Sequence, residues 1–288
     1  MRVELKNTTK KLCIIGDPVL HSKSPLIQNT MIGVLGLDYI YLCQSVPGGQ
    51  AGAWLDCARA AGYAGFNATM PHKQALVPLM DELDEDARMY GAVNTVCIRD
   101  GKSYGYNTDG RGFLAALQSV GISTRGMRVL VLGAGGAARA VVPKLCQEGG
   151  VEQVFVANRT ADRAQALCTL APAGRCVSAG FDSENLKRLA GACDLVVNCT
   201  NLGMTGTGGQ FEDLSFLDAL RPESAVCDLI YSPAETLLLQ QARLRGHIAV
   251  NGLGMLIYQA VFALEHFTGT AIDAGAMVPV VERALKET

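Results

Sequence analysis

A short apolar run that ends in a glycine-rich turn constrains the fold of this chain more than any other feature. Residues 128–132 read RVLVL, the next six read GAGGAA, and a helical pattern, AARAVVPKLCQEG, follows from residue 137. In a strand–GxGxxA–helix unit, one glycine makes the tight turn, the next lets backbone NH groups approach a pyrophosphate, and the small third residue allows close packing. The helix N-terminus then faces the anion. The pattern predicts a dinucleotide site that includes Gly133, Gly135, Gly136 and Ala137.

The end of the next predicted strand, QVFVA at 153–157, indicates which dinucleotide binds. An NAD-dependent enzyme normally has an acidic residue here, roughly 20 residues after the turn, on the ribose hydroxyl. This chain has Asn158, Arg159 and Thr160, with Arg163 one helical turn further on. Two guanidinium groups suit a 2′-phosphate. Alternatively they only face solvent, although two cations at a helix N-terminus are unfavourable without an anion. We predict NADP, with NAD as the alternative.

Apolar runs alternate with amphipathic stretches along the whole chain, which predicts an α/β fold with mostly parallel strands. The expected strands lie within residues 11–16, 38–46, 128–133, 151–158, 193–200 and 224–230, and the expected helices within 49–62, 110–121, 161–171 and 255–269. A chain of 288 residues is long enough for two cores.

We place a domain boundary near residue 110, where a helical stretch separates the first strands from the glycine-rich turn. The last apolar helix has no following strand, and we expect it to return to the first domain. The predicted domains are 1–109 plus 252–288, which would bind substrate, and 110–251, a Rossmann domain.

Composition excludes several classes of protein. No apolar run approaches the roughly 18 residues that a membrane span needs, and the N-terminal residues do not resemble a secretory signal. A net charge of −2, with dispersed Lys and Arg, offers no basic surface for nucleic acid. These features predict a cytoplasmic protein with a small-molecule partner, and they leave monomer and homodimer open.

The cysteines and histidines give no sign of a metal or of structural disulfides. Ten cysteines are widely spaced without a CxxC pair, which predicts that most are reduced and buried. The four histidines lack ligand spacing, so we predict no metal and expect His21 and His72 to be structural or to face solvent.

Two hydroxyl groups near the N-terminus predict an anion site. Residues 16–25 read GDPVLHSKSP, in which Pro25 suits the first position of a helix. Ser24 alone could be an ordinary N-cap. Ser22 has no such role, and the two hydroxyls beside free NH groups would suit a small carboxylate.

Further polar residues follow predicted strands of the first domain. Asn67, Thr69 and Lys73 belong to NATMPHK, Asn94 belongs to GAVNT, and Asp109 belongs to GYNTDG. Open α/β sheets bind ligands at strand ends, so these residues are candidates for one site. Taken singly, a lysine is more often solvated and an aspartate before glycine more often a turn residue or cap.

Taken in order, the motifs resemble those of the shikimate dehydrogenase family, including its quinate/shikimate branch. The motifs are HSKSP, NATMPHK, GAVNT, GYNTDG, GAGGAARA, NRT, NCTNLGM, DLIYSPAETLLLQQA and NGLGMLIYQ, and they span nearly the whole chain. The resemblance implies NADPH-dependent reduction of 3-dehydroshikimate to shikimate, in chorismate biosynthesis. It also implies that the C-terminal helices return to the substrate domain and that the active site lies in the cleft between the domains.

The resemblance also implies roles for individual residues. Lys73 and Asp109 would be the catalytic pair, with the lysine ammonium donating a proton to the ketone oxygen as hydride arrives at carbon. Which of the two is the base in the reverse direction stays open. The remaining residues divide into three groups: Ser22 and Ser24 for the substrate carboxylate, Thr69, Asn94 and Gln259 for ring hydroxyls, and Asn67 and Tyr231 on the substrate side.

Thr200, Gly252 and Met255 are expected on the cofactor side, although Met255 could equally be an ordinary core residue. Gln28 stands where the commonest family pattern has histidine, and Asn251 where it often has aspartate. Because QN, MPHKQ and GYNTDG also resemble the quinate/shikimate branch, quinate is an alternative substrate.

A noncatalytic NADP-binding regulator is the alternative from another class of protein. In that interpretation Lys73 and Asp109 would be incidental, and the first domain would bind a partner.

Overall fold

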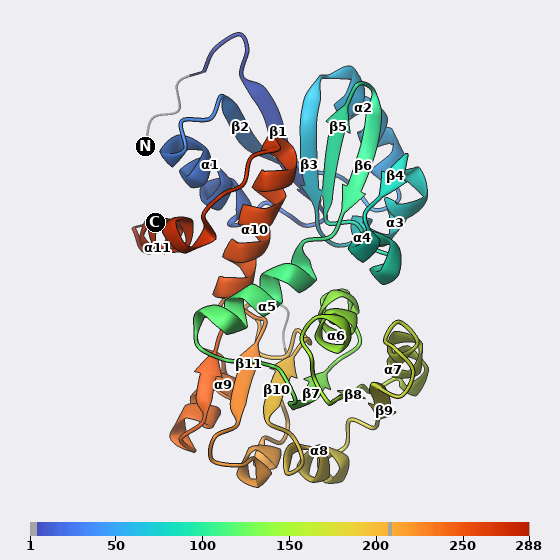
Figure 1. Ribbon diagram of the computed structural model, residues 1–288, viewed down its shortest axis with the longest axis vertical. Coiled ribbons are helices and arrows are strands. Elements are labelled where there is room, and N and C mark those ends of the chain that lie inside the picture. The colour runs from blue at the N-terminus through green and yellow to red at the C-terminus, as the bar shows by residue number, and fades with distance from the viewer. Residues whose placement is uncertain (1–4, 207–208, 288) are drawn as a thin grey trace. The chain divides into compact units, whose positions relative to one another are not determined.

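The chain folds into two compact α/β units. The computed structural model describes residues 5–206 and 209–287, so the first four residues of the predicted N-terminal domain lie outside this part. One unit comprises the described residues up to Gly112 together with those from Ile257 onward, and the other is Phe113–Leu256 (Figure 1). Two helices, α5 (Asp109–Ser119) and α10 (Leu253–Thr268), contain residues of both units.

The sheet of the first unit contains both parallel and antiparallel strand pairs, and its last strand, β4, is parallel to β6. Its strand order is β2-β1-β3-β5-β6-β4, with β1 parallel to both β2 and β3, and β5 antiparallel to both β3 and β6. Alternate residues of adjacent strands, such as Cys13 and Ile15 of β1 and Phe66 of β3, pack into one core. The strands are β1 (Lys10–Gly16), β2 (Tyr39–Ser45), β3 (Tyr63–Ala68), β4 (Glu82–Leu83), β5 (Thr95–Arg99) and β6 (Lys102–Tyr106).

The hairpin of β5 and β6 was not among the predicted strands. Its turn consists of Asp100 and Gly101, which have φ angles of 51° and 76°. Two central residues with positive φ are typical of a two-residue hairpin turn, in which Asp-Gly is a favoured pair. The hairpin places Asn94 just before β5, and Asp109 follows β6 at the same end of the sheet.

Helices complete the first unit, and α11 packs against α1 (Figure 1). Besides α10 and the first residues of α5, they are α1 (Ser24–Val34), α2 (Ala51–Ala60), α3 (His72–Ala75), α4 (Glu85–Tyr90) and α11 (Ala274–Lys286), with the 3-10 helix η1 (Val77–Leu79). Within the described ranges, no helix is long and apolar enough to cross a membrane.

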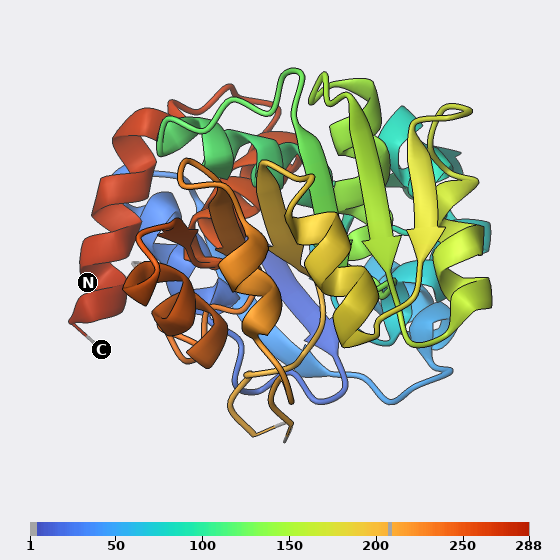
Figure 2. The same cartoon turned by 90° about the horizontal axis from the view of Figure 1, so that it is seen from below.

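The second unit has a fully parallel sheet, as predicted for a Rossmann fold. Its strand order is β12-β11-β10-β7-β8-β9, with helices on both faces of the sheet (Figure 2). The strands are β7 (Arg128–Leu132), β8 (Gln153–Ala157), β9 (Cys176–Ala179), β10 (Leu195–Asn198), β11 (Ala225–Asp228) and β12 (Ile248–Val250). The helices that lie wholly within the unit are α6 (Ala138–Gln147), α7 (Ala161–Cys168), α8 (Ser183–Ala190), α9 (Leu237–Leu244) and the 3-10 helix η2 (Ser215–Ala219).

The apolar runs of this sheet supply two cores, because successive side chains of a strand point to opposite faces. On β7, Val129 and Val131 pack with α6 and α7, whereas Leu130 and Leu132 pack with α8, η2 and α9. A strand buried on both faces needs apolar residues at its buried positions, which is why VLVL at 129–132 shows no alternation of polar and apolar residues.

A buried carboxylate joins three elements at the carboxyl ends of β10 and β11. Asp228 accepts hydrogen bonds from Asn198 Nδ2 at 2.9 Å, the Ile230 NH at 3.1 Å and Thr236 Oγ1 at 2.6 Å. Thr236 is also the N-cap of α9 and accepts from the Leu239 NH. Burial raises the pKa of Asp228, and the three hydrogen bonds oppose that effect.

Thr236→Val is expected to lower the free energy of unfolding by about 2 kcal/mol, because it removes a cap and a donor to a buried carboxylate. The lost donor stabilised the charged form, so the loss shrinks as the pH falls through the raised pKa of Asp228. Urea unfolding at neutral and acid pH measures both effects. Thr270→Val, at an exposed threonine, is the control and should change stability by less than about 0.5 kcal/mol. An equal loss at both pH values would contradict the role given to Asp228.

Candidate active site

An ion pair lies at one end of the first sheet. Lys73 belongs to α3, shortly after β3, and Asp109 is the first residue of α5, shortly after β6. Lys73 Nζ lies 2.6 Å from Asp109 Oδ2, and 25% and 10% of the two side chains are exposed. The pair is thus largely buried but still partly exposed to solvent.

Strand pairing explains why residues so far apart in the sequence meet here. The carboxyl ends of β1 and β3 lie side by side, because Ile15 pairs with Ala68 in parallel. The antiparallel pairs Asn67–Thr95 and Thr95–Tyr106 bring the start of β5 and the end of β6 to the same end of the sheet as the carboxyl ends of β1 and β3. The loops and turns that carry the predicted polar residues of this unit therefore begin at one end of the sheet, as expected from the sequence.

Asn94 fixes the second oxygen of Asp109. Its Nδ2 donates to Asp109 Oδ1 at 2.8 Å and to Thr108 Oγ1 at 3.0 Å, and its Oδ1 accepts from the Thr108 NH at 3.0 Å. Asn94 and Lys73 thus hold one oxygen each of the same carboxylate. Both amide hydrogens of Asn94 are used in these contacts.

A second layer of hydrogen bonds supports Asn94 from inside the unit. Asn67 Nδ2 donates to the Asn94 carbonyl at 3.1 Å and to Thr95 Oγ1 at 2.9 Å. The Tyr41 hydroxyl donates to Asn67 Oδ1 at 2.7 Å, and only 1% of Tyr41 is exposed. Sequence reasoning missed Tyr41, which lies in the apolar run of β2 and carries no motif that distinguishes it from a core aromatic residue.

Tyr41→Phe tests whether this inner layer positions the carboxylate. Removing the hydroxyl leaves Asn67 Oδ1 buried without its donor. We therefore expect kcat for the ketone reduction that the family resemblance implies to fall about fivefold, and the free energy of unfolding to fall by about 1 kcal/mol. KM should change less than kcat, because Tyr41 itself is buried and reaches the substrate side only through Asn67. Tyr39→Phe, on the same strand and half-buried, is the matched control. A change in KM without a change in kcat would contradict a positioning role.

The predicted anion site begins in the loop that follows β1. Ser22 Oγ accepts a hydrogen bond from the Ser24 NH at 3.2 Å, and Ser24 is buried in the first turn of α1. Two details differ from the sequence interpretation, because Lys23 occupies the N-cap position and Pro25 is the second helical residue. The Ser22 hydroxyl thus satisfies an NH group of the first turn, and Ser24 is not the cap.

Thr69 and Gln259 are placed by close backbone packing within the same unit. The Thr69 NH donates to the Ile15 carbonyl at 2.9 Å, which holds Thr69 beside the end of β1. Gln259 lies on α10. A Cβ added at Gly112 would lie 2.8 Å from the backbone nitrogen of Gln259. Gly112 therefore lets α10 approach the first turn of α5, three residues from Asp109.

The glycine turn of the second unit has the geometry expected of a dinucleotide site. Gly133 has a φ of 97°, and a Cβ there would lie 2.8 Å from Thr200 Cγ2. At Gly135 and Gly136 an added Cβ would meet no atom within 4 Å. Packing therefore demands glycine only at the first position, while the other two leave the backbone open to a ligand. Ala137, at the N-cap of α6, forms no side-chain cap, and the first turn has no acidic residue.

Asn158 connects the glycine turn to the loop after β8. Its Oδ1 accepts from the Ala134 NH at 3.2 Å, and its Nδ2 donates to the Thr160 carbonyl at 2.8 Å. Thr160 is the N-cap of α7, with Arg159 before it and Arg163 in the first turn. Both arginines are exposed, and the Arg159 guanidinium lies 5.9 Å from the centre of the Phe181 ring.

The remaining predicted residues of the second unit follow its strands. The Thr200 NH and hydroxyl both donate to Asn198 Oδ1, at 3.0 Å and 2.7 Å. Burial raises the pKa of the Tyr231 hydroxyl. Gly252 is required by packing, since a Cβ there would lie 2.0 Å from the Leu229 carbonyl oxygen. Met255 packs against the core that contains α6, so its contacts within the unit are those of a core methionine.

The two histidines near the motifs differ in their surroundings. His72 is buried, and its Nε2 lies 2.8 Å from the Val46 carbonyl oxygen, whereas His21 is exposed. In the described part of the chain, no group of three or more His, Cys, Asp or Glu side chains is arranged to hold a metal.

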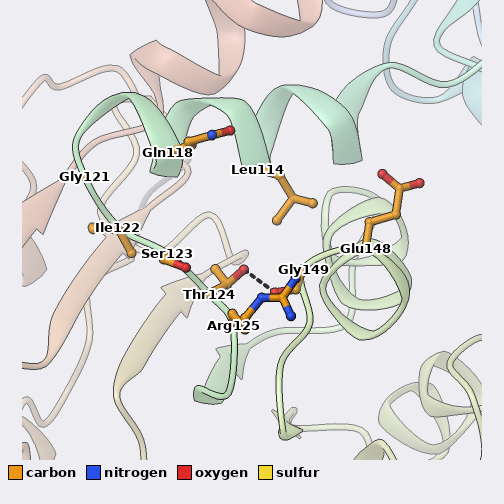
Figure 3. A pocket seen from close by; sticks show the side chains of 9 residues that line it. All are labelled: Leu114, Gln118, Gly121, Ile122, Ser123, Thr124, Arg125, Glu148 and Gly149. Atoms are coloured by element: carbon orange, nitrogen blue, oxygen red, sulfur yellow. Dashed lines mark hydrogen bonds between the residues drawn. The ribbon is translucent and has the colours of Figure 1, made fainter.

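A pocket of about 360 Å³ in the second unit includes none of the predicted site residues (Figure 3). It lies beside α5 and the end of α6, where Thr124 Oγ1 donates to the Gly149 carbonyl at 2.7 Å. Its walls are Leu114, Gln118, Gly121, Ile122, Ser123, Thr124, Arg125, Glu148 and Gly149.

The chain matches known proteins over most of its length. Three family models match: the shikimate dehydrogenase substrate binding domain at 14–96, shikimate / quinate 5-dehydrogenase at 115–204, and the shikimate 5'-dehydrogenase C-terminal domain at 252–282. A curated relative, shikimate dehydrogenase (NADP(+)) of Rubrobacter xylanophilus, is 44% identical over 273 residues, covering 93% of this chain and 94% of the relative.

Two solved structures show the same fold. Shikimate 5-dehydrogenase of Thermus thermophilus, in complex with NADP(H) and shikimate, is 34% identical with a TM-score of 0.83, covering 96% of this chain and 99% of that one. A 5-ketofructose reductase of Gluconobacter is 31% identical with a TM-score of 0.84, at the same coverage of both chains. Sequence and fold together assign the chain to the shikimate dehydrogenase family.

Proposed function

We propose that this protein is a shikimate dehydrogenase, which reversibly reduces 3-dehydroshikimate to shikimate with NADPH in chorismate biosynthesis. The observation that carries the proposal is the Lys73–Asp109 pair, 2.6 Å apart and held by Asn94. A ketone reduction needs a proton donor at the oxygen, and a half-buried ammonium fixed by a carboxylate supplies one. Bound NADPH supplies the hydride.

The first unit is proposed to bind the substrate. Ser22 and Ser24 would hold the ring carboxylate at the start of α1, where the helix N-terminus also favours an anion. Thr69 and Gln259 would contact ring hydroxyls, with Asn67 on the substrate side. Tyr231, which is also proposed for the substrate side, belongs to the second unit. Asn94 would exchange its hydrogen bond to Thr108 for one to a ring hydroxyl while it keeps Asp109 in place.

Lys73 and Asp109 act as one unit in both directions. In reduction, Lys73 Nζ donates a proton to the carbonyl oxygen, and Asp109 stabilises the ammonium form beforehand. In oxidation, the pair accepts the hydroxyl proton.

The second unit is proposed to bind NADP, and its residues fit that cofactor. Gly135, Gly136 and Ala137 leave the start of α6 open to a pyrophosphate. The exposed guanidinium groups of Arg159 and Arg163 would hold the 2′-phosphate from the first turn of α7. Asn158, Thr160, Thr200, Gly252 and Met255 would line the rest of the cofactor site.

The substrate and cofactor are tested together by following the absorbance of reduced nicotinamide. Purified protein is given shikimate or quinate, each with NADP and then with NAD, and reduction of 5-ketofructose by NADPH is run beside them. We expect fast turnover only with shikimate and NADP. Comparable rates with quinate or NAD would place the protein in the quinate/shikimate branch, and turnover of 5-ketofructose alone would overturn the proposal. No turnover with intact NADP binding would favour the noncatalytic regulator.

A further inference from the structure

Two cysteines of the second unit bring their sulfur atoms unusually close together. Cys168 is the last residue of α7, and Cys176 is the first residue of the edge strand β9. Cys176 Sγ donates a hydrogen bond to Cys168 Sγ across 2.6 Å. A disulfide bond is about 2.05 Å long, so a movement of roughly 0.6 Å separates the pair from a covalent bond.

The surrounding fold already holds the two chain segments together. Ser178 Oγ of β9 donates to Gln165 Oε1 of α7 at 2.8 Å. The Val154 NH of β8 donates to the Arg175 carbonyl at 2.8 Å, which fixes the residue before Cys176. Bond formation between the sulfurs therefore requires little rearrangement of the backbone.

The two thiols are unequal, which suits a two-step oxidation. The hydrogen bond from Cys176 lowers the pKa of Cys168, while the same bond and burial raise the pKa of Cys176. The thiolate is the reactive form of cysteine, so Cys168 is the nucleophile of the pair. Both residues are half-buried, which leaves them within reach of small oxidants.

We propose that Cys168 and Cys176 form a redox modification site, at which hydrogen peroxide converts the two thiols into a disulfide. The Cys168 thiolate attacks one peroxide oxygen, the O–O bond breaks, and one water leaves once the released hydroxide takes up a proton. Cys176 then attacks the sulfur of the resulting sulfenic acid, the S–S bond forms, and a second water leaves. Two sulfurs lose two electrons in total, and the peroxide gains them. A dithiol reductant reverses the reaction.

The disulfide would join the end of α7 to the edge of the sheet. It closes a loop of nine residues, Cys168 to Cys176, whose middle is largely exposed. Closing such a loop restricts the unfolded chain, so we expect oxidation to raise Tm by about 5 °C.

The test uses the full-length protein, reduced and then exposed to hydrogen peroxide in its native state. We expect the intact mass to fall by two hydrogens. Free thiols are then blocked, and the protein is digested with trypsin, which cleaves after Arg175 and so separates the two cysteines. Peptides 164–175 and 176–187 should be recovered as one linked species that a dithiol reductant separates.

Cys168→Ser and Cys176→Ser should each abolish the linked peptide and the rise in Tm. Cys57→Ser, at an exposed cysteine, is the matched control and should retain both. The proposal is overturned if peroxide modifies Cys57 while Cys168 and Cys176 remain free. It is also overturned if either residue is instead linked to Cys146, the neighbouring thiol on α6. The peptide map of the unsubstituted protein gives this answer even if a serine variant folds poorly.

Discussion

Lys73→Met is expected to lower kcat for shikimate oxidation about 10³-fold while the affinity for NADP stays nearly unchanged. Methionine keeps much of the length of the side chain but cannot transfer a proton, and positioned acid–base groups typically contribute 10²- to 10⁴-fold. It also removes the partner that lies 2.6 Å from Asp109 Oδ2. Steady-state kinetics and an NADP titration measure the two quantities separately.

Lys102→Met is the matched control for this prediction, because it makes the same substitution at an exposed lysine of the same unit. It should retain the kcat of the unsubstituted protein. Asp109→Asn should also lower kcat strongly, since it removes the charge that holds the ammonium. If Lys73→Met kept a kcat within tenfold of the unsubstituted protein, Lys73 would not be the proton donor.

The double variant Arg159→Ala/Arg163→Ala is expected to lower kcat/KM for NADP about 10³-fold with little change for NAD. Hydrogen bonds to a charged group contribute about 2 kcal/mol each, and two such contacts give about 4 kcal/mol, or roughly three factors of ten. NAD lacks the 2′-phosphate and loses nothing by the change. The ratio of the two kcat/KM values isolates the phosphate contact from any general damage to the fold.

Arg188→Ala, an exposed arginine on α8 in the same unit, is the control and should leave the ratio unchanged. The two single variants should each lose about half of the free energy lost by the double variant. An equal loss with NADP and NAD would show that the two arginines do not discriminate the phosphate.

Much of the fold could be predicted because buried parallel strands have a strong signal. Residues 129–132, VLVL, are apolar at every position since β7 is covered on both faces, and the glycine turn after them follows from the same strand–helix geometry. The β5–β6 hairpin was missed because β6 alternates apolar and polar residues weakly, with Gly105 facing Val96. Only the Asp100–Gly101 pair marked it, and that signal is two residues long.

The sequence could predict that the candidate residues lie near strand ends, but not how their side chains are arranged. Lys73, Asn94 and Asp109 each follow or precede a strand, and strand ends are where ligands bind. That the lysine and the asparagine divide the two carboxylate oxygens between them depends on side-chain rotamers, which no sequence pattern encodes. Cys168 and Cys176 were missed in the same way, since a helix end and a strand start met in space without a CxxC spacing.

Asn158 limits how the cofactor preference of this protein could be re-engineered. An obvious route towards NAD installs a carboxylate at this position, where it could bind the ribose hydroxyls. Here, however, the amide nitrogen of Asn158 donates to the Thr160 carbonyl while the amide oxygen accepts from the Ala134 NH. An aspartate could keep the second bond but would face the Thr160 carbonyl with like partial charge. The same substitution would therefore loosen the start of α7 from the glycine turn, so a switch of cofactor at this position needs a second change that supplies a new donor to that carbonyl.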